Sequence, residues 1–191
     1  RLVWGKSLNA GQTCIAPDHL FVQQKLKGPL LTEMKRAIET FYGASPLKSQ
    51  HLGRIVNDRQ YQRLKALLDN AKEKGQVIFG GESDDQERRI SPTLIDIESR
   101  DDPLMEEELF GPLMPILSVS NFKEVIKDIR NQPQPLAIYM FGGTTKEQQI
   151  LINQTSSGGV CFNDVVMQAG IPELPFGGIG PSGMGKYHGK A

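Results

Sequence analysis

The sequence predicts an α/β fold with a largely parallel sheet, and three observations point to it. Apolar residues recur at helical spacing in several segments, short apolar runs stand between these segments, and glycine or proline often marks the boundaries. Strand-like and helix-like segments that alternate at these lengths are typical of a parallel sheet covered by helices. Since we find no internal repeat and no obvious linker, residues 1–191 are predicted to form one domain.

Individual elements follow from the same periodicity. The sequence predicts helices over residues 27–42, 58–74, 122–129 and 144–153. It predicts strands over residues 19–24, 76–79, 91–97, 114–119, 136–141 and 159–162. Thr144 and Glu147 have the spacing of a capping box, which fixes the start of the last helix. The apolar run at 136–141 is expected to be a buried strand, and the chain from Gly170 onward is expected to be an ordered loop.

Composition excludes several classes of function. The 22 Lys and Arg residues balance the 22 Asp and Glu residues, so neither nucleic acid nor an anionic membrane is predicted as a partner. No stretch approaches the length of a membrane span. Only two cysteines are present, Cys14 and Cys161, which fits a reducing, cytoplasmic setting better than a disulfide framework. The three histidines are scattered without metal-ligand spacing, so no metal site is predicted.

Cys14 is the first candidate for chemistry. Gly11 allows a sharp turn just before it, and a thiol after a tight turn can project into a cleft. If a helix starts here, its first amides would favour the thiolate and would stabilise an oxyanion on a carbonyl substrate. The alternative interpretation is a small buried core residue, as free cysteines often are. Cys161 lies in a predicted strand and is interpreted as such a core residue.

The second candidate is the acidic segment 106–108, which runs directly into Leu-Phe-Gly-Pro. A carboxylate held at such a turn can accept hydrogen bonds from sugar hydroxyls. The alternative is an ordinary solvated loop, which a run of three carboxylates usually forms.

The glycine-rich tail imitates two nucleotide-binding motifs, and both are rejected. Residues 178–183 match G-x-G-x-x-G, but a proline-rich segment precedes them and only eight residues follow. Residues 180–186 match the start of a P-loop, but Tyr187 stands where a Ser or Thr must bind Mg²⁺.

Seven collinear motifs cover nearly the whole chain. They are NAGQTCIAP at 9–17, GRIVN at 53–57, SPT at 91–93, EELFGP at 107–112, PLA at 135–137, SSGGV with ND between 156 and 164, and LPFGG, SGMG and HG between 174 and 189. Each motif alone is weak, but the ordered set resembles the aldehyde dehydrogenase superfamily. The Ala-Pro after Cys14 and the Gly-Met-Gly to Tyr-His-Gly tail resemble its class 3, or fatty aldehyde, branch.

The resemblance implies an oxidoreductase that converts an aldehyde to a carboxylic acid with NAD or NADP. Cys14 matches the nucleophile, which forms a thiohemiacetal and then a thioester that water hydrolyses. Glu108 matches the residue that hydrogen-bonds the nicotinamide ribose, and Phe110 matches the aromatic beside it. Positions near the substrate channel are matched by Asn163, Phe176 and His188.

The resemblance also implies an open three-layer α/β/α catalytic domain within a longer protein. The coenzyme domain, the general-base Glu and the oxyanion-hole Asn are expected before Arg1, and a dimer-forming strand after Ala191. The full-length protein is expected to be a homodimer, cytoplasmic or membrane-associated through a tail not present here. Two alternatives stay open: a non-catalytic truncated domain, and a thiol acyltransferase or esterase-like hydrolase that uses Cys14 without a nicotinamide.

Overall fold

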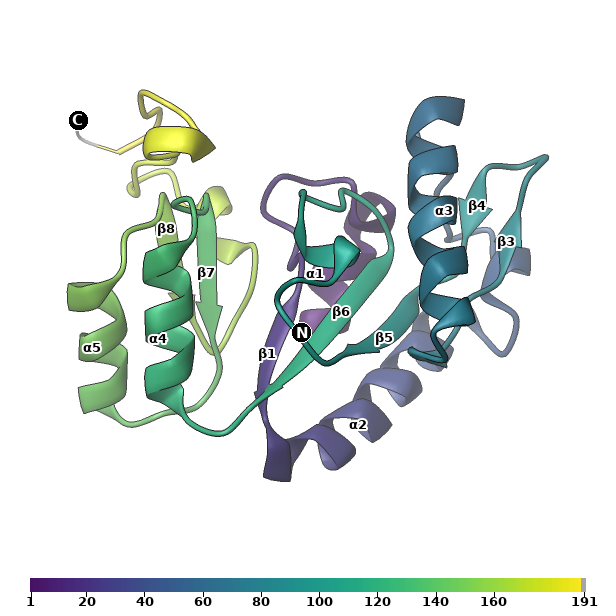
Figure 1. The fold of residues 1–191 in the computed structure, drawn as a ribbon. Helices are drawn as coiled ribbons and strands as arrows, with labels where there is room; N and C mark the ends of the chain where they lie inside the picture. The colour runs from purple at the N-terminus through teal and green to yellow at the C-terminus, as the bar shows by residue number, and fades with distance from the viewer. Residues whose placement is uncertain (190–191) are drawn as a thin grey trace. The chain divides into compact units, whose positions relative to one another are not determined.

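The computed structural model describes residues 1–189 of the chain, which divide into two compact units (Figure 1). One unit comprises Leu2–Ser118, and the other comprises Arg1 and the chain from Val119 onward. The prediction of one domain over residues 1–191 stays a prediction.

The Leu2–Ser118 unit contains a four-stranded sheet with helices on both faces. Its helices are α1 (Leu2–Ser7), α2 (Gln24–Tyr42) and α3 (Asp58–Glu73). Its strands are β1 (Leu20–Gln23), β2 (Val77–Phe79), β3 (Ser83–Asp84), β4 (Arg89–Ile90), β5 (Thr93–Ile97) and β6 (Leu113–Val119). The sheet has the order β1-β6-β5-β2, while β3 and β4 form a separate hairpin.

The sheet is mixed, within a confirmed α/β fold class. Strands β5 and β6 run parallel, with Thr93 opposite Leu113. Strand β2 pairs antiparallel with β5, with Val77 opposite Ile95. The return from β2 to β5 passes through the β3–β4 hairpin and contains no crossover helix, so the antiparallel direction is the available one.

Two apolar clusters, one on each face of the sheet, form the core of this unit. Ile95 of β5 packs with Leu68 of α3 in one cluster. The next residue back along β5, Leu94, packs with Met34 and Ile38 of α2 in the other. Because successive strand residues point to opposite faces, β5 is covered by α3 on one side and by α1 and α2 on the other. This is the three-layer arrangement that the resemblance implies.

Most boundaries lie within two residues of the predicted ones, but one helix start and one hairpin differ more. Helix α2 begins at Gln24, directly after β1, and contains Pro29 in its second turn. The helix starts earlier than the predicted Lys27 because the extended Gln23 serves as its N-cap, with no loop between strand and helix. The β3–β4 hairpin was not predicted, since its sequence is charged and lacks apolar alternation.

The second unit contains a two-stranded parallel sheet and two helices. Its elements are α4 (Phe122–Asn131), β7 (Ala137–Met140), α5 (Thr145–Gln154) and β8 (Gly159–Phe162). Ala137 of β7 lies opposite Gly159 of β8. The predicted capping box is confirmed: the Glu147 N–H donates to Thr144 Oγ1 at 3.2 Å, and the Thr144 N–H donates to Glu147 Oε2 at 2.7 Å.

A strand is present at 137–140, but the prediction that it is buried is wrong. Residues 137–140 are half-buried, and Phe141 is 42% exposed. Strand β7 belongs to a sheet of only two strands, so it lacks the neighbours that cover the central strands of the other unit. The tail beyond Gly170 is ordered locally by a backbone bridge between Phe176 and Tyr187. Within residues 1–189, no helix combines the length and apolar character needed to cross a bilayer.

We expect Leu68→Ala to lower the free energy of unfolding by about 2–5 kcal/mol, because it leaves a cavity between α3 and the sheet. Leu68 is 0% exposed, whereas Leu26 on α2 is 51% exposed, so Leu26→Ala is a matched control with an expected loss below about 1 kcal/mol. Urea unfolding followed by circular dichroism measures both. Equal losses for the two variants would contradict this assignment of the core.

Candidate active site

The turn that carries Cys14, residues 9–16, is called the cysteine turn. It follows α1 through three successive residues with left-handed backbone: Asn9 (φ 50°), Ala10 (φ 55°) and Gly11 (φ 76°). A side chain at Gly11 would place its Cβ 2.2 Å from the carbonyl oxygen of Gly111. Gly11 is therefore required both for its conformation and for its contact with Gly111, which confirms the predicted sharp turn.

The thiol of Cys14 is exposed at the end of this turn. The alternative prediction of a buried core cysteine is therefore wrong. The hypothesis that a helix starts at Cys14 is also wrong, because the residues after it form a turn in which the Ala16 N–H donates to the Thr13 carbonyl at 2.9 Å. Helix-end amides therefore do not stabilise a thiolate here, and what the turn supplies is exposure of the sulfur.

A second loop, residues 106–112, lies against the cysteine turn and is called the glutamate loop. Its three carboxylates, at 106–108, are all exposed, as the solvated-loop interpretation predicts. Phe110 has a left-handed backbone (φ 49°), and a Cβ on Gly111 would lie 2.4 Å from Leu64 Cδ1. Backbone geometry and close packing on α3 therefore determine the path of this loop.

Side chains from α3 hold the backbone around Glu108. Gln60 Nε2 donates to the carbonyl oxygens of Leu109 at 2.9 Å and Phe110 at 3.2 Å. Arg63 Nη2 donates to the carbonyl of Glu108 at 3.0 Å and to that of Leu109. Since these contacts use main-chain oxygens, the Glu108 carboxylate stays available to other donors.

A buried lysine and a carboxylate link the two loops. Lys6 of α1 is 6% exposed, and its Nζ lies 4.0 Å from Asp18 Oδ1. Asp18 Oδ1 in turn accepts the Leu109 N–H at 3.0 Å. Asp18 lies just after the cysteine turn, and Leu109 lies in the glutamate loop just after Glu108. The Asp18 carboxylate therefore links the cysteine turn to the glutamate loop. Composition and spacing did not single out Lys6 or Asp18; the only signal was that they stand on either side of the motif at 9–17.

The pKa values in this cluster are shifted by burial and by neighbouring charges. Burial lowers the pKa of Lys6 to about 8, although the charges of Asp18 and Glu108 oppose the change. Burial opposes ionisation of Asp18, but its hydrogen bond to His19 and the charges of Lys6 and His19 bring its pKa below the ordinary value. Desolvation, followed by the charge of Asp18, raises the pKa of Glu108.

The three predicted channel residues belong to the second unit, whereas Cys14 belongs to the first, so their place near a substrate channel stays a prediction. Asn163 is exposed with left-handed backbone (φ 58°), and its Oδ1 accepts the Gly142 N–H at 2.8 Å. Phe176 lines a cavity of about 180 Å³ beside β8. His188 is exposed, and its ring centroid lies 3.8 Å from that of Tyr187.

Cys161 of β8 differs from the core residue that was predicted. It is only half-buried, which reflects the partial cover of the β7–β8 sheet. Desolvation is the main cause that raises the pKa of its thiol, and Asp164 adds to the effect. A raised thiol pKa disfavours the nucleophilic thiolate, so Cys161 is a poor competitor for Cys14.

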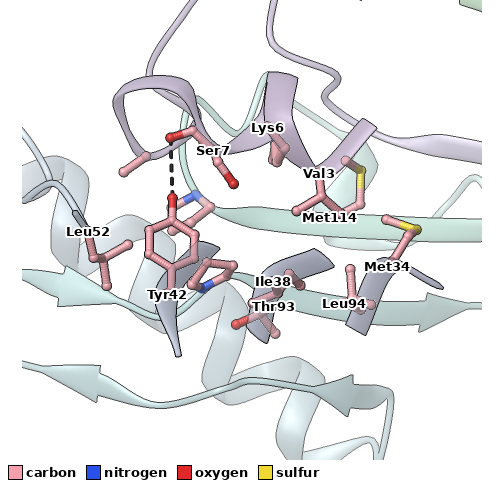
Figure 2. A pocket seen from close by; sticks show the side chains of 13 residues that line it. Val3, Lys6, Ser7, Met34, Ile38, Tyr42, Leu52, Thr93, Leu94 and Met114 are labelled. Carbon is pink, nitrogen blue, oxygen red and sulfur yellow. Dashed lines mark hydrogen bonds between the residues drawn. The ribbon is translucent and has the colours of Figure 1, made fainter. Parts of the chain in front are cut away.

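A separate cavity lies in the core of the Leu2–Ser118 unit, between α1, α2 and the sheet (Figure 2). Its volume of about 20 Å³ accommodates roughly one water molecule. Its lining is mostly apolar, and the Tyr42 hydroxyl donates to the Ser7 carbonyl at 3.4 Å on one side. Neither Cys14 nor Glu108 lines it, so it is a packing void of the core.

Fold and site together define an α/β protein with an exposed cysteine on a strained turn, braced by a loop that presents a carboxylate. Among the described residues, no cluster of His, Cys, Asp or Glu is arranged to hold a metal ion. The sequence profile of the aldehyde dehydrogenase family matches residues 1–191. The chain belongs to the aldehyde dehydrogenase family.

Curated relatives agree with this membership. The chain is 44% identical over 191 residues to the rat "aldehyde dehydrogenase, dimeric NADP-preferring", and it is covered completely. It is 45% identical over 190 residues to the 4,4'-diaponeurosporen-aldehyde dehydrogenase of Staphylococcus aureus. It is 44% identical to human aldehyde dehydrogenase family 3 member B1. The chain spans about 41% of the length of the first two relatives and about 40% of the third.

Solved structures share the fold. The substrate-bound state of Staphylococcus aureus AldH matches with a TM-score of 0.95 and 44% identity, over 99% of this chain and 41% of that one. An NAD-dependent aldehyde dehydrogenase from Sinorhizobium meliloti matches with a TM-score of 0.85 over 98% of this chain and 38% of that one. At 23% identity, the second match shows the fold alone.

We expect Gly11→Ala to destabilise the protein by about 1–3 kcal/mol and to displace the cysteine turn, since the new Cβ would meet the Gly111 carbonyl. Gly28→Ala is the matched control, because nothing lies within 4 Å of a Cβ at Gly28 and alanine favours its helix. Thermal unfolding measures both variants. A Gly11→Ala protein as stable as the wild type would contradict the close approach of the two loops.

The buried Lys6 predicts a rise in stability with alkaline pH. Its pKa of about 8 lies below the ordinary 10.5, so between these values the unfolded chain binds more protons than the folded one. Below pH 8 folding carries the full cost of burying the charged Lys6 ammonium, and this cost decreases as the pH rises toward 10.5. Relative to Lys6→Met, the wild-type free energy of unfolding should rise by about 1–3 kcal/mol between these pH values. Urea unfolding of both proteins near pH 8 and near pH 10.5 tests this, and a difference in unfolding free energy that stays the same at both pH values refutes it.

Proposed function

We propose that the protein containing this chain oxidises an aldehyde to a carboxylic acid, with NAD or NADP as the hydride acceptor and Cys14 as the nucleophile. The observation that carries the proposal is the exposed Cys14 thiol on a turn held against the glutamate loop. Family membership supports the same chemistry. The similar proteins are named aldehyde dehydrogenases, and the name of the rat protein adds a preference for NADP.

Cys14 carries out the covalent steps. Its thiolate adds to the aldehyde carbon, and the carbonyl oxygen becomes an oxyanion that the backbone N–H of Cys14 stabilises. When bound, the nicotinamide supplies the acceptor for the hydride that leaves this thiohemiacetal. Cys14 then holds the acyl group as a thioester, and attack by water breaks the C–S bond, releasing the acid and regenerating the thiol.

Glu108 and Phe110 are proposed to position the coenzyme. The Glu108 carboxylate is exposed and free of main-chain partners, so it can accept hydrogen bonds from ribose hydroxyls. Desolvation and the charge of Asp18 raise the pKa of this carboxyl, while the charges of Lys6 and Arg63 favour its anionic form. Phe110 follows with a left-handed backbone, and its ring is proposed to lie beside the nicotinamide ribose.

Substrate and assembly belong to the same proposal. We expect a long-chain, apolar aldehyde, with Asn163, Phe176 and His188 near its channel, and a homodimeric full-length protein that is cytoplasmic or membrane-associated. Sequence likeness to family 3 relatives supports the substrate class. The word "dimeric" in the name of the rat protein supports the assembly.

The test is formation of reduced nicotinamide from a long-chain aldehyde by the full-length protein, followed by absorbance. Cys14→Ser should lower kcat on the order of 10³-fold or more, as loss of a covalent nucleophile does. Cys161→Ser is the matched control and should keep most of the activity, because its thiol is half-buried with a raised pKa.

Turnover by the wild type that survives Cys14→Ser would refute the assignment of the nucleophile. Ester hydrolysis without nicotinamide, in a protein that does not oxidise aldehydes, would favour the acyltransferase or esterase alternative. If the wild type carries out neither reaction, the non-catalytic interpretation replaces the proposal.

A further inference from the structure

Gln12 stands two residues before Cys14, and every polar atom of its buried side chain is paired. The residue is 8% exposed. Its Nε2 donates to the carbonyl oxygens of Asn9 at 3.0 Å and Arg54 at 2.9 Å. Its Oε1 accepts the Val56 N–H at 2.8 Å. One amide thus joins the cysteine turn to a segment more than 40 residues away, because the partners lie 42 and 44 positions along the chain.

Three further hydrogen bonds of the turn are local. The Gln12 N–H donates to the Asn9 carbonyl at 3.1 Å, and Asn9 Nδ2 donates back to the Gln12 carbonyl at 3.1 Å. The Ala16 N–H donates to Thr13. Such bonds hold the shape of a turn but not its place in the molecule. The left-handed Ala10 costs about 1–2 kcal/mol, so the turn persists only while its surroundings hold it.

The segment that receives Gln12 is itself firmly anchored. Ile55 is 1% exposed, and its N–H donates to the Arg88 carbonyl of the β3–β4 hairpin at 2.8 Å. Asn57 caps α3 by accepting the Gln60 N–H at 2.9 Å. Gln12 therefore connects the cysteine turn to the start of α3, the helix whose side chains hold the glutamate loop.

We propose that Gln12 is a positioning residue for Cys14: it fixes the cysteine turn to residues 54–56, so the thiol keeps one orientation toward the substrate. The inference deepens the proposed function and rests on it. Gln12 touches no reacting atom and acts through the backbone of the turn. A displacement of about 1 Å at a reacting group can cost on the order of 10²-fold in rate, which is the effect expected when this link is removed.

The test compares three variants of the full-length protein. Gln12→Glu keeps the shape but replaces the donor amide by an acceptor that faces the Asn9 and Arg54 carbonyls. Gln12→Met keeps the length without any hydrogen bond. Gln62→Glu, on the exposed face of α3, is the control with the same chemical change. Each protein is measured by amide hydrogen exchange, by kcat and by the KM for the coenzyme.

The expected result is exchange about tenfold faster at residues 9–16 and at the Val56 N–H, with exchange in the core of α3 unchanged. The kcat should fall about 10–100-fold while the KM for the coenzyme stays within about threefold. Gln62→Glu should match the wild type in every measurement. Faster exchange confined to the turn supports the link even if the wild type oxidises no aldehyde, so failure of the proposed function is recognised separately.

Three outcomes overturn the inference. The first is unchanged exchange at the turn in both Gln12 variants. The second is local loosening of the turn with unchanged kcat, in a wild type that is active. The third is loss of structure throughout the unit in both variants, which would make Gln12 a residue of the fold with no separate part in orienting the thiol.

Discussion

The Asp18 carboxylate is the point on which the two loops of the site depend. It accepts the Leu109 N–H on one side and faces the buried Lys6 ammonium on the other. Burying a charged pair costs desolvation, and it is tolerated where hydrogen bonds satisfy the remaining lone pairs. Here the same atom, Asp18 Oδ1, accepts the Leu109 N–H and lies 4.0 Å from Lys6 Nζ, so one carboxylate links the end of the cysteine turn to the glutamate loop.

Local features of the fold could be predicted from the sequence because they are encoded locally. The turn at Gly11 follows from one glycine, and the start of α5 follows from Thr144 and Glu147. Whether a helix starts at Cys14 was left open by the sequence, and the structure has a turn there, because a turn and a first helical turn begin with similar short sequences. Burial of β7 was overpredicted, since its apolar composition does not report how many strands lie beside it.

The candidate site was only partly predictable. Exposure of Cys14 was one of two open interpretations, and Glu108 was chosen through a family resemblance. Gln12, a buried amide with three satisfied partners, has no signal in composition or periodicity, since its partners lie more than 40 residues away. Lys6 likewise looks like any helical lysine until α1 is packed against the sheet. Such roles arise from tertiary contacts, which a single sequence does not display.

The contact between Gly11 and Gly111 has a consequence for protein engineering. A side chain at Gly11 would meet the Gly111 carbonyl, and one at Gly111 would meet Leu64 of α3, so the cysteine turn keeps its path only while the glutamate loop stays seated on α3. Moving the tetrapeptide Gly-Gln-Thr-Cys into another scaffold would carry the thiol without the surface that determines its conformation. The smallest transferable unit is therefore two loops from distant parts of the chain, with α3 beneath them.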